Sequence, residues 1–197
     1  MHWAWQCGVD GIDYRKARDE AANAGTLVHS MVEEQIHGRD PEKVLYVGTF
    51  DGIGKPHAIN PEIAKAARVG FKAYLGWLSE TRIQFEKTEF PLVSEMYKFG
   101  GTPDAVGRLS GGDLVLLDFK TGRTYPDHLT QISAYKHLWN ENNEEQVTSA
   151  HLLRFDKTYG VPTHKFFGNA QLEVAWEAFK HLLTLYELDK ELGRMSK

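Results

Sequence analysis

The sequence contains a single cysteine, Cys7, among 197 residues. One thiol cannot form an intrachain disulfide, and it excludes a multi-cysteine zinc site or an iron–sulfur cluster. This cysteine usage favours a reducing, cytoplasmic setting. No apolar run reaches the ~18–20 residues that span a bilayer, and the first residues lack the basic start and apolar stretch of a signal peptide. We therefore expect an intracellular protein that does not associate with membranes.

An excess of positive charge is also missing. Lys and Arg number 23 against 27 Asp and Glu, which gives a net charge of −4 at pH 7. A protein that coats DNA without sequence preference would be basic, so this class is disfavoured. The net charge of −4 does not exclude an enzyme that binds nucleic acid at a local site. Because 42% of the residues are hydrophobic and 25% are charged, we expect one globular domain over residues 1–197.

The sequence lacks internal repeats and a Gly-rich phosphate loop. Apolar residues at helical spacing predict helices over 13–37, 61–81, 126–141 and 170–192. We expect Asn60 to cap the second helix, Gly25-Thr26 to break the first, and residues 47–61 to form a loop. Strands are predicted over 83–86, 89–93, 96–99, 103–109, 113–120, 147–155 and 163–167. This order predicts an α/β fold with a mixed, mostly antiparallel sheet flanked by helices.

The sharpest local feature is an apolar strand that ends in Asp118-Phe119-Lys120. Strand alternation places the side chains of Asp118 and Lys120 on one face. An isolated Asp-x-Lys is usually just a strand emerging into solvent, so a second feature is needed to indicate a site.

Asp104, at the start of the preceding strand, supplies that second feature. If residues 110–112 form a three-residue loop, Leu109 pairs with Asp113, and each step outward keeps the register until Asp104 lies opposite Asp118. Opposite residues share a face with Cβ atoms ~4.5–5.5 Å apart, and two carboxylates that close need a cation between them. A two-residue Gly-Gly turn would instead place Asp104 on the other face. Glycines in the loop favour the three-residue form, which predicts a divalent-cation site beside a lysine.

Four motifs in this order resemble the PD-(D/E)XK nucleases of the RecB-like exonuclease branch, which includes the mitochondrial genome maintenance exonuclease and many phage exonucleases. They are GTLVH at 25–29, GTPD at 101–104, DFKTG at 118–122 and QISAY at 131–135. The resemblance spans roughly residues 3–140 and implies a restriction-endonuclease-like core, in a chain encoded by a bacterium or a phage. Two departures matter. The iron–sulfur subgroup is excluded, and we expect a trimmed or naturally short N-terminus that removes part of the DNA channel.

The resemblance implies a role for each matching residue. Asp104 and Asp118 would bind the metal together with the backbone carbonyl of Phe119 and the side chain of His29. Lys120 would be the catalytic lysine. Gln131 and Tyr135, which share a helix face, would contact the substrate strand. Arg108 and Arg123 lie near these motifs in sequence and are candidate phosphate contacts.

For one histidine and two glutamates, a role at the metal is weighed against another position or function. His29 lies beside an apolar stripe, where a helical histidine is often an ordinary interior residue. Glu33, one turn later, is either a solvated helix charge or an outer partner of the metal. Glu89 precedes the hairpin and is a further candidate for the same cation.

These residues predict hydrolysis of DNA phosphodiester bonds with Mg²⁺ or Mn²⁺ as cofactor. We expect an exonuclease that prefers single-stranded or frayed ends and serves DNA recombination, repair or replication, where partner proteins are a further expectation. Two alternatives remain. One is a non-catalytic nucleic-acid-binding module derived from a nuclease, and the other is an enzyme that acts only within a larger complex.

Overall fold

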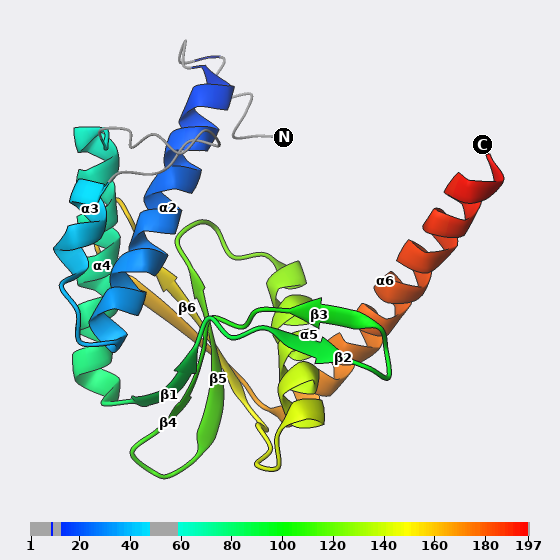
Figure 1. Cartoon of the computed structure of the whole chain (residues 1–197). Helices are drawn as coiled ribbons and strands as arrows, with labels where there is room; N and C mark the ends of the chain where they lie inside the picture. Colours follow the sequence, from blue (N-terminus) through cyan, green and yellow to red (C-terminus); the bar gives the residue numbers. More distant parts are fainter. Residues whose placement is uncertain (1–8, 10–12, 48–58, 197) are drawn as a thin grey trace. The chain divides into compact units, whose positions relative to one another are not determined.

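The structure, a computed structural model, describes residue 9, residues 13–47 and residues 59–196 (Figure 1). Cys7, the N-terminal segment and most of the predicted loop at 47–61 lie outside the described residues. The chain divides into two compact units: Met1–Glu80, Lys120–Gly122 and Arg154–Thr163 form one, and Thr81–Phe119, Arg123–Leu153 and His164–Lys197 form the other. The expectation of one nuclease domain over residues 1–197 stays a prediction.

The first unit is mainly helical. It contains α2 (Tyr14–Ile36), the 3₁₀ turn η1 (Pro41–Lys43), α3 (Val44–Val47) and α4 (Pro61–Thr81). Helix α4 begins as predicted, because the Asn60 side chain accepts a hydrogen bond from the Glu62 N–H at 2.9 Å. Tyr74 on α4 is fully buried, and its hydroxyl donates to Oε1 of Gln35 on α2 at 2.5 Å. This bond satisfies the one polar atom of a large interior side chain and ties the two helices together.

The predicted break at Gly25-Thr26 is wrong, because α2 runs without interruption from Tyr14 to Ile36. Thr26 does not cap a helix: its hydroxyl donates to the Ala22 carbonyl at 3.2 Å, as in a helix interior. A Cβ atom at Gly25 would lie 2.6 Å from the Thr121 hydroxyl oxygen. Glycine therefore stands here because another segment approaches the helix closely, and that requirement outweighs the helix propensity it loses.

The five-stranded sheet, which lies mostly in the second unit, has the order β1-β4-β5-β6-β7. Its strands are β1 (Gln84–Thr88), β4 (Ala105–Arg108), β5 (Leu114–Lys120), β6 (Ala150–Phe155) and β7 (Pro162–Phe167). β4 pairs antiparallel with both β1 and β5. A separate antiparallel ribbon joins β2 (Leu92–Ser94) to β3 (Phe99–Gly101). The mixed, mostly antiparallel α/β fold with flanking helices is thus as predicted.

Three of the predicted strands start three residues too early, at 89, 96 and 147 instead of Leu92, Phe99 and Ala150, and a positive φ accounts for the first two. Glu89 has a φ of 45° and follows β1 in a bend, so the strand expected over 89–93 begins only at Leu92. Residues 95–98 form the turn between β2 and β3, where Lys98 has a φ of 57°. A positive φ interrupts an extended strand, which is why apolar alternation alone misplaced these boundaries.

Two helices complete the second unit, α5 (Pro126–Asn142) and α6 (Asn169–Met195), both near their predicted bounds. A core cluster joins Leu114 and Leu116 of β5 to Ile132 and Trp139 of α5 and Leu172 of α6. Among the described tryptophans, those at 77, 139 and 176 are buried, as expected for packing residues. The described segments contain no helix with the length and hydrophobicity needed to cross a membrane.

Buried Lys136 fixes α6 against α5. Its ammonium group donates to Oδ1 of Asn169 at 2.7 Å and forms an ion pair with Glu173. The side chain of Lys136 is only 4% exposed, so these partners replace the water that the charge loses on burial. The start of α6 is therefore held in one place relative to the helix that carries Gln131 and Tyr135.

Candidate active site

The β4–β5 hairpin has the register predicted from its loop. The Leu109 N–H donates to the Asp113 carbonyl at 3.0 Å, and Gly112 has a φ of 93°. Ala105 pairs with Leu117, so the next residues outward, Asp104 and Asp118, lie opposite each other. A residue in the left-handed region is what a three-residue hairpin loop requires, and glycine supplies it without strain.

Backbone hydrogen bonds from two neighbouring segments fix Asp104. One of its carboxylate oxygens, Oδ2, accepts from the Phe119 N–H at 2.5 Å. Its main-chain carbonyl accepts from the Glu89 N–H at 3.0 Å. A hydrogen bond to a carboxylate is stronger than one between neutral groups. The Asp104 side chain is thereby held beside the peptide that follows Asp118.

Three carboxylates gather at this end of the hairpin. An oxygen of Glu89 lies within 4.8 Å of an oxygen of Asp104, and Asp118, opposite Asp104, is only 1% exposed. Glu89 was predicted on a strand, but its bend after β1 is what brings it to Asp104. Carboxylates this close repel one another unless a cation lies among them.

The electrostatic field of this cluster reaches Tyr135 on α5. Burial is the main cause that raises the pKa of the Tyr135 hydroxyl, and the negative charges of Asp118, Asp104 and Glu89 raise it further. A tyrosine near three anions stays protonated and can donate a hydrogen bond. Tyr135 thus connects helix α5 electrostatically to the acidic cluster.

Gln131 and Tyr135 form the predicted pair on one face of α5. The Gln131 side-chain amide donates to the Tyr135 hydroxyl oxygen at 3.0 Å. A Cβ atom at Gly101 would lie 2.6 Å from Cε1 of Tyr135. The glycine of the GTPD motif therefore has a packing role: it leaves room for the ring that faces the cluster.

The remaining motif residues belong to the first unit. Lys120 ends β5 half-buried, and the strand alternation puts its side chain on the same face of β5 as that of Asp118. Thr121, the next residue, approaches Gly25 on α2. His29 and Glu33 follow Gly25 by one and two helical turns and are half-buried on the same side of that helix. Metal binding by His29 and an outer role for Glu33 stay predictions.

The two arginines predicted to contact phosphates differ in their surroundings. Arg108 lies at the far end of β4 from Asp104, about 13 Å along the strand. Its guanidinium bonds Glu86 and Glu145 at 2.8 and 2.9 Å, and these hydrogen bonds hold the pKa of Arg108 above its usual range. The structure thus gives Arg108 a structural role: it links β4 to Glu86 of β1 and to Glu145. Arg123 is exposed just after the DFKTG motif, and its DNA contact stays a prediction.

Sequence reasoning did not single out Lys157. Its ammonium nitrogen lies 3.8 Å from the Cβ position of Gly25, where Thr121 also approaches. Burial lowers the pKa of this lysine. No local pattern marks it, because its position beside the GTLVH and DFKTG motifs depends on a contact between distant parts of the chain.

The donor set of the cluster fits a hard divalent cation. Oxygens of Glu89 and Asp104 lie within 4.8 Å of each other, and the hairpin register puts Asp118 opposite Asp104. Carboxylate oxygens are the ligands that Mg²⁺ and Mn²⁺ prefer. A cation there would offset the mutual repulsion of the acids, so the residues present fit the metal that the motifs imply.

Comparisons with known proteins identify the family. The sequence profile of the PD-(D/E)XK nuclease superfamily matches residues 2–190. No curated protein matches the chain. Among solved structures, a candidate exonuclease from Eubacterium rectale is 15% identical, with a TM-score of 0.46, and the match covers 80% of this chain and 64% of that one.

Two further solved structures are similar to parts of the chain. SSO0001 is 16% identical over 62% of this chain and 61% of its own length, with a TM-score of 0.38. LHK-Exo, solved in complex with dAMP, is 17% identical over 73% of this chain and 80% of its own length, also with a TM-score of 0.38. The chain therefore spans less than two thirds of the first two of these relatives.

The profile match covers nearly the whole chain and includes all four motifs from which the resemblance was inferred. Members of this superfamily are nucleases, act on nucleic acid and generally use divalent metals. The chain belongs to the PD-(D/E)XK nuclease superfamily.

Proposed function

We propose that this chain is a Mg²⁺- or Mn²⁺-dependent DNA exonuclease that starts from single-stranded or frayed ends. The observation that carries the proposal is the carboxylate cluster of Glu89, Asp104 and Asp118 beside Tyr135, in a chain of a nuclease superfamily. A role in DNA recombination, repair or replication belongs to the same proposal.

In this mechanism Asp104 and Asp118 would hold the cation, with the Phe119 carbonyl, His29 and Glu89 as further ligands. The bound metal supplies Lewis acidity toward the phosphate and lowers the pKa of a water molecule. The Phe119 N–H holds the carboxylate of Asp104 in place beside the peptide that follows Asp118. The clustered acids also repel phosphate when no metal is bound, and DNA binding should therefore depend on the cation.

Lys120 orients or deprotonates the attacking water, or stabilises the charge that develops on the phosphate. Its place two residues after Asp118 on β5 supports this role, because both side chains leave the same face of the strand. Gln131 and Tyr135 would position the strand, since their hydrogen bond holds the tyrosine hydroxyl next to the cluster.

The preference for ends rests on the resemblance to RecB-like exonucleases and on the low positive charge of the chain, which carries a net −4. Strong clamping of duplex DNA uses many phosphate contacts, and Arg108 is already bound to two glutamates. A chain with a net negative charge, in which Arg108 is held by two glutamates, suits a strand end better than a long duplex.

The test compares linear and closed circular DNA, both single- and double-stranded, in Mg²⁺, Mn²⁺ and EDTA. The proposal expects linear DNA to be shortened only with metal and circles to stay intact. Equal cutting of circles would make the enzyme an endonuclease. Binding of DNA without cleavage in any metal would favour the non-catalytic module, and cleavage only with added partner proteins would favour the complex-dependent alternative.

A further inference from the structure

A pocket of about 380 Å³ opens between β3, α5 and α6. Gly101 and Tyr135 line it, and the same tyrosine lies in the field of the three carboxylates. Tyr135 is therefore the residue that the pocket and the acidic cluster have in common. A nucleic acid strand whose phosphate lies at the cluster would have its neighbouring groups near Tyr135 and thus near this pocket.

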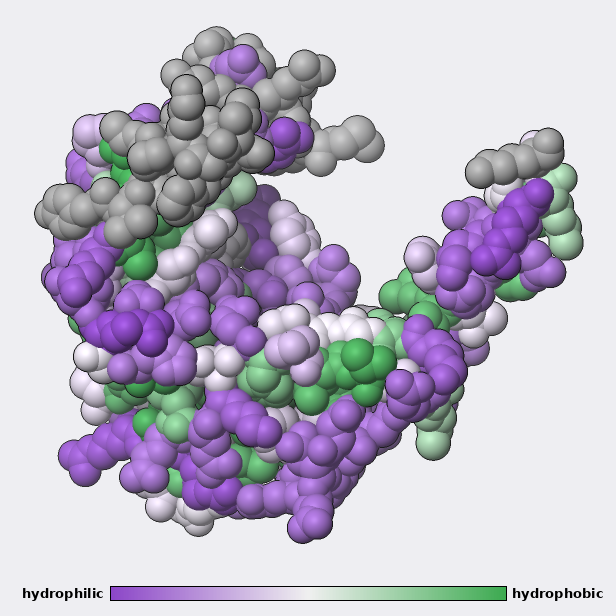
Figure 2. All heavy atoms as spheres, viewed as in Figure 1, coloured by the Kyte–Doolittle hydropathy of each residue, from purple (hydrophilic) through white to green (hydrophobic). Residues whose placement is uncertain are grey.

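Its walls are apolar and aromatic. The rings of Phe99 on β3 and Phe179 on α6 lie with centroids 4.7 Å apart, and Leu182 adds an exposed aliphatic surface. Figure 2 shows apolar side chains at the surface over the β2–β3 ribbon and along α6. Flat apolar walls of this kind bind flat rings, whereas they offer nothing to a phosphate.

The polar groups of the pocket come from one face of α5. Thr130 and Gln131 follow Asp127 by three and four residues, and all three residues line one side of the pocket. Their carboxylate, hydroxyl and amide groups are hydrogen-bond acceptors and donors of the kind that read the edge of a heterocycle. The carboxylate of Asp127 also disfavours an anionic occupant.

We propose that this pocket binds a nucleobase of the substrate strand, next to the phosphate held at the carboxylate cluster. The inference rests on the proposed function and deepens it, because it assigns Phe99, Phe179 and Leu182 to substrate binding. The wall that Phe99, Phe179 and Leu182 form takes one face of the base, and the α5 side chains meet its edge. Since every base has a flat face, this mode of binding tolerates any sequence.

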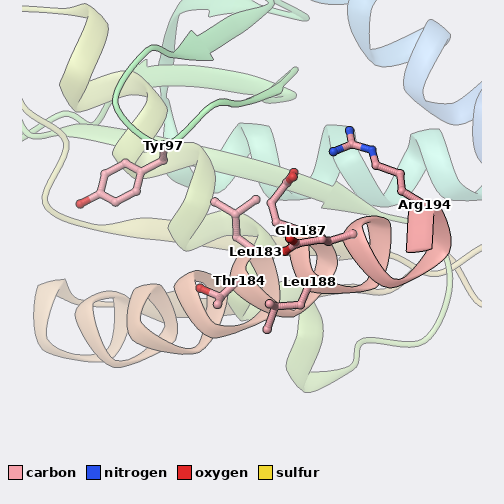
Figure 3. A pocket seen from close by; sticks show the side chains of 7 residues that line it. Tyr97, Leu183, Thr184, Glu187, Leu188 and Arg194 are labelled. Carbon is pink, nitrogen blue, oxygen red and sulfur yellow. The ribbon is translucent and has the colours of Figure 1, made fainter. Parts of the chain in front are cut away.

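A larger pocket of about 570 Å³ along α6 does not have this chemistry (Figure 3). Tyr97 lies at one side of it, and Glu187, Glu191 and Arg194 contribute most of its charge. None of its lining residues belongs to a motif of the site. Two glutamates on one wall would repel a nucleotide, so its greater size does not make it the base site.

The test measures binding of a fluorescent single-stranded oligothymidylate and of the same strand with abasic sites at the last few nucleotides of both ends. A Lys120→Ala background with Mg²⁺ keeps the strands intact during titration. The pocket variants are Phe179→Ala and Leu182→Ala. Leu185→Ala, on the same helix but outside the pocket, is the control, since Leu185 is 63% exposed. Leu182 is 54% exposed, so the fold should tolerate Leu182→Ala. This variant keeps the test decisive if Phe179→Ala does not fold.

Stacking on aromatic side chains contributes about 1–3 kcal/mol per base, or roughly a 5- to 150-fold change in affinity. The protein with an intact pocket should therefore bind the base-bearing strand at least about fivefold more tightly than the abasic strand. Phe179→Ala and Leu182→Ala should reduce this ratio without weakening the abasic strand, and Leu185→Ala should leave it unchanged.

An unchanged ratio in both pocket variants would overturn the inference. So would a change in the sedimentation of the free protein with no change in the ratio, which would mean that another protein copy fills the pocket. If the wild type digests DNA ends but the Lys120→Ala protein binds both strands equally, the inference fails and the proposed function stands. If it neither digests nor binds DNA, both fail.

Discussion

Replacing Gly101 by alanine tests how the GTPD motif positions Tyr135. The added methyl group would lie 2.6 Å from Cε1 and 3.2 Å from Cδ1 of the tyrosine ring. Carbon atoms pack best at about 3.5–4.0 Å, so the ring must move by roughly 1 Å. The ring has little freedom to do so, because Gln131 bonds its hydroxyl and Leu138 lies 3.4 Å from the same methyl position.

Overpacking of this kind costs about 1–3 kcal/mol. For a chain of this size, each kcal/mol lowers the melting temperature by about 2–4 °C, so Gly101→Ala should melt roughly 2–12 °C below the wild type. The same displacement changes the position of Tyr135 relative to the carboxylates and should slow DNA cleavage. Gly111→Ala is the control, because its methyl group would have no neighbour closer than 4.0 Å.

A double-mutant cycle with Tyr135→Ala isolates the clash. Without the ring, the extra methyl group has space, so Gly101→Ala should cost less in that background, by about 0.5–3 kcal/mol. The measurement is the free energy of unfolding from denaturant titrations of the four proteins. Strict additivity, or a Gly101→Ala protein as stable as the wild type, would refute the packing role assigned to this glycine.

Three further predictions concern stability. Tyr74→Phe removes the hydrogen bond to Gln35 inside the first unit and should lower the free energy of unfolding by about 1–2 kcal/mol in urea titrations; an unchanged value would contradict it. Gly76 is at an exposed position of helix α4, and a methyl group added there would have no atom within 4 Å. Gly76→Ala should therefore raise the free energy of unfolding by about 0.5–1 kcal/mol; a lower melting temperature would argue against this. Burial lowers the pKa of His151 from 6.5 to about 4. As the pH falls, this histidine therefore gains its proton in the unfolded chain before it does in the folded protein. The free energy of unfolding should accordingly decrease by up to about 3 kcal/mol between pH 6.5 and 4. His151→Gln should flatten that slope, and an equally steep slope would exclude this histidine as its source.

The hairpin that carries Asp104 and Asp118 could be predicted from the sequence because its register depends on a short loop. Ser110-Gly111-Gly112 has only a few ways to connect two strands, and a positive φ at Gly112 selects the three-residue form. Once the loop is fixed, strand alternation determines which residues are opposite each other. The same reasoning placed Gln131 and Tyr135 on one helix face.

Features that depend on distant contacts could not be predicted. Gly25 looked like a helix break because the approach of Thr121 is invisible in the local pattern. Glu89 looked like a strand residue because nothing in its neighbours signals a φ of 45°. The pocket wall formed by Phe99 and Phe179 joins residues 80 positions apart, and both fit an ordinary core pattern.

The central claim is that Asp118 and Lys120 hydrolyse DNA with a divalent metal. The most direct measurement is digestion of end-labelled linear single-stranded DNA by the wild type, Asp118→Asn and Lys120→Ala, in Mg²⁺ and in EDTA, with circular dichroism to verify the fold of each variant. The account predicts metal-dependent shortening by the wild type and at least about a hundredfold slower shortening by each folded variant, since loss of one group that stabilises the transition state costs about 3 kcal/mol or more. Shortening that persists in EDTA, or at an undiminished rate in folded Asp118→Asn, would contradict it.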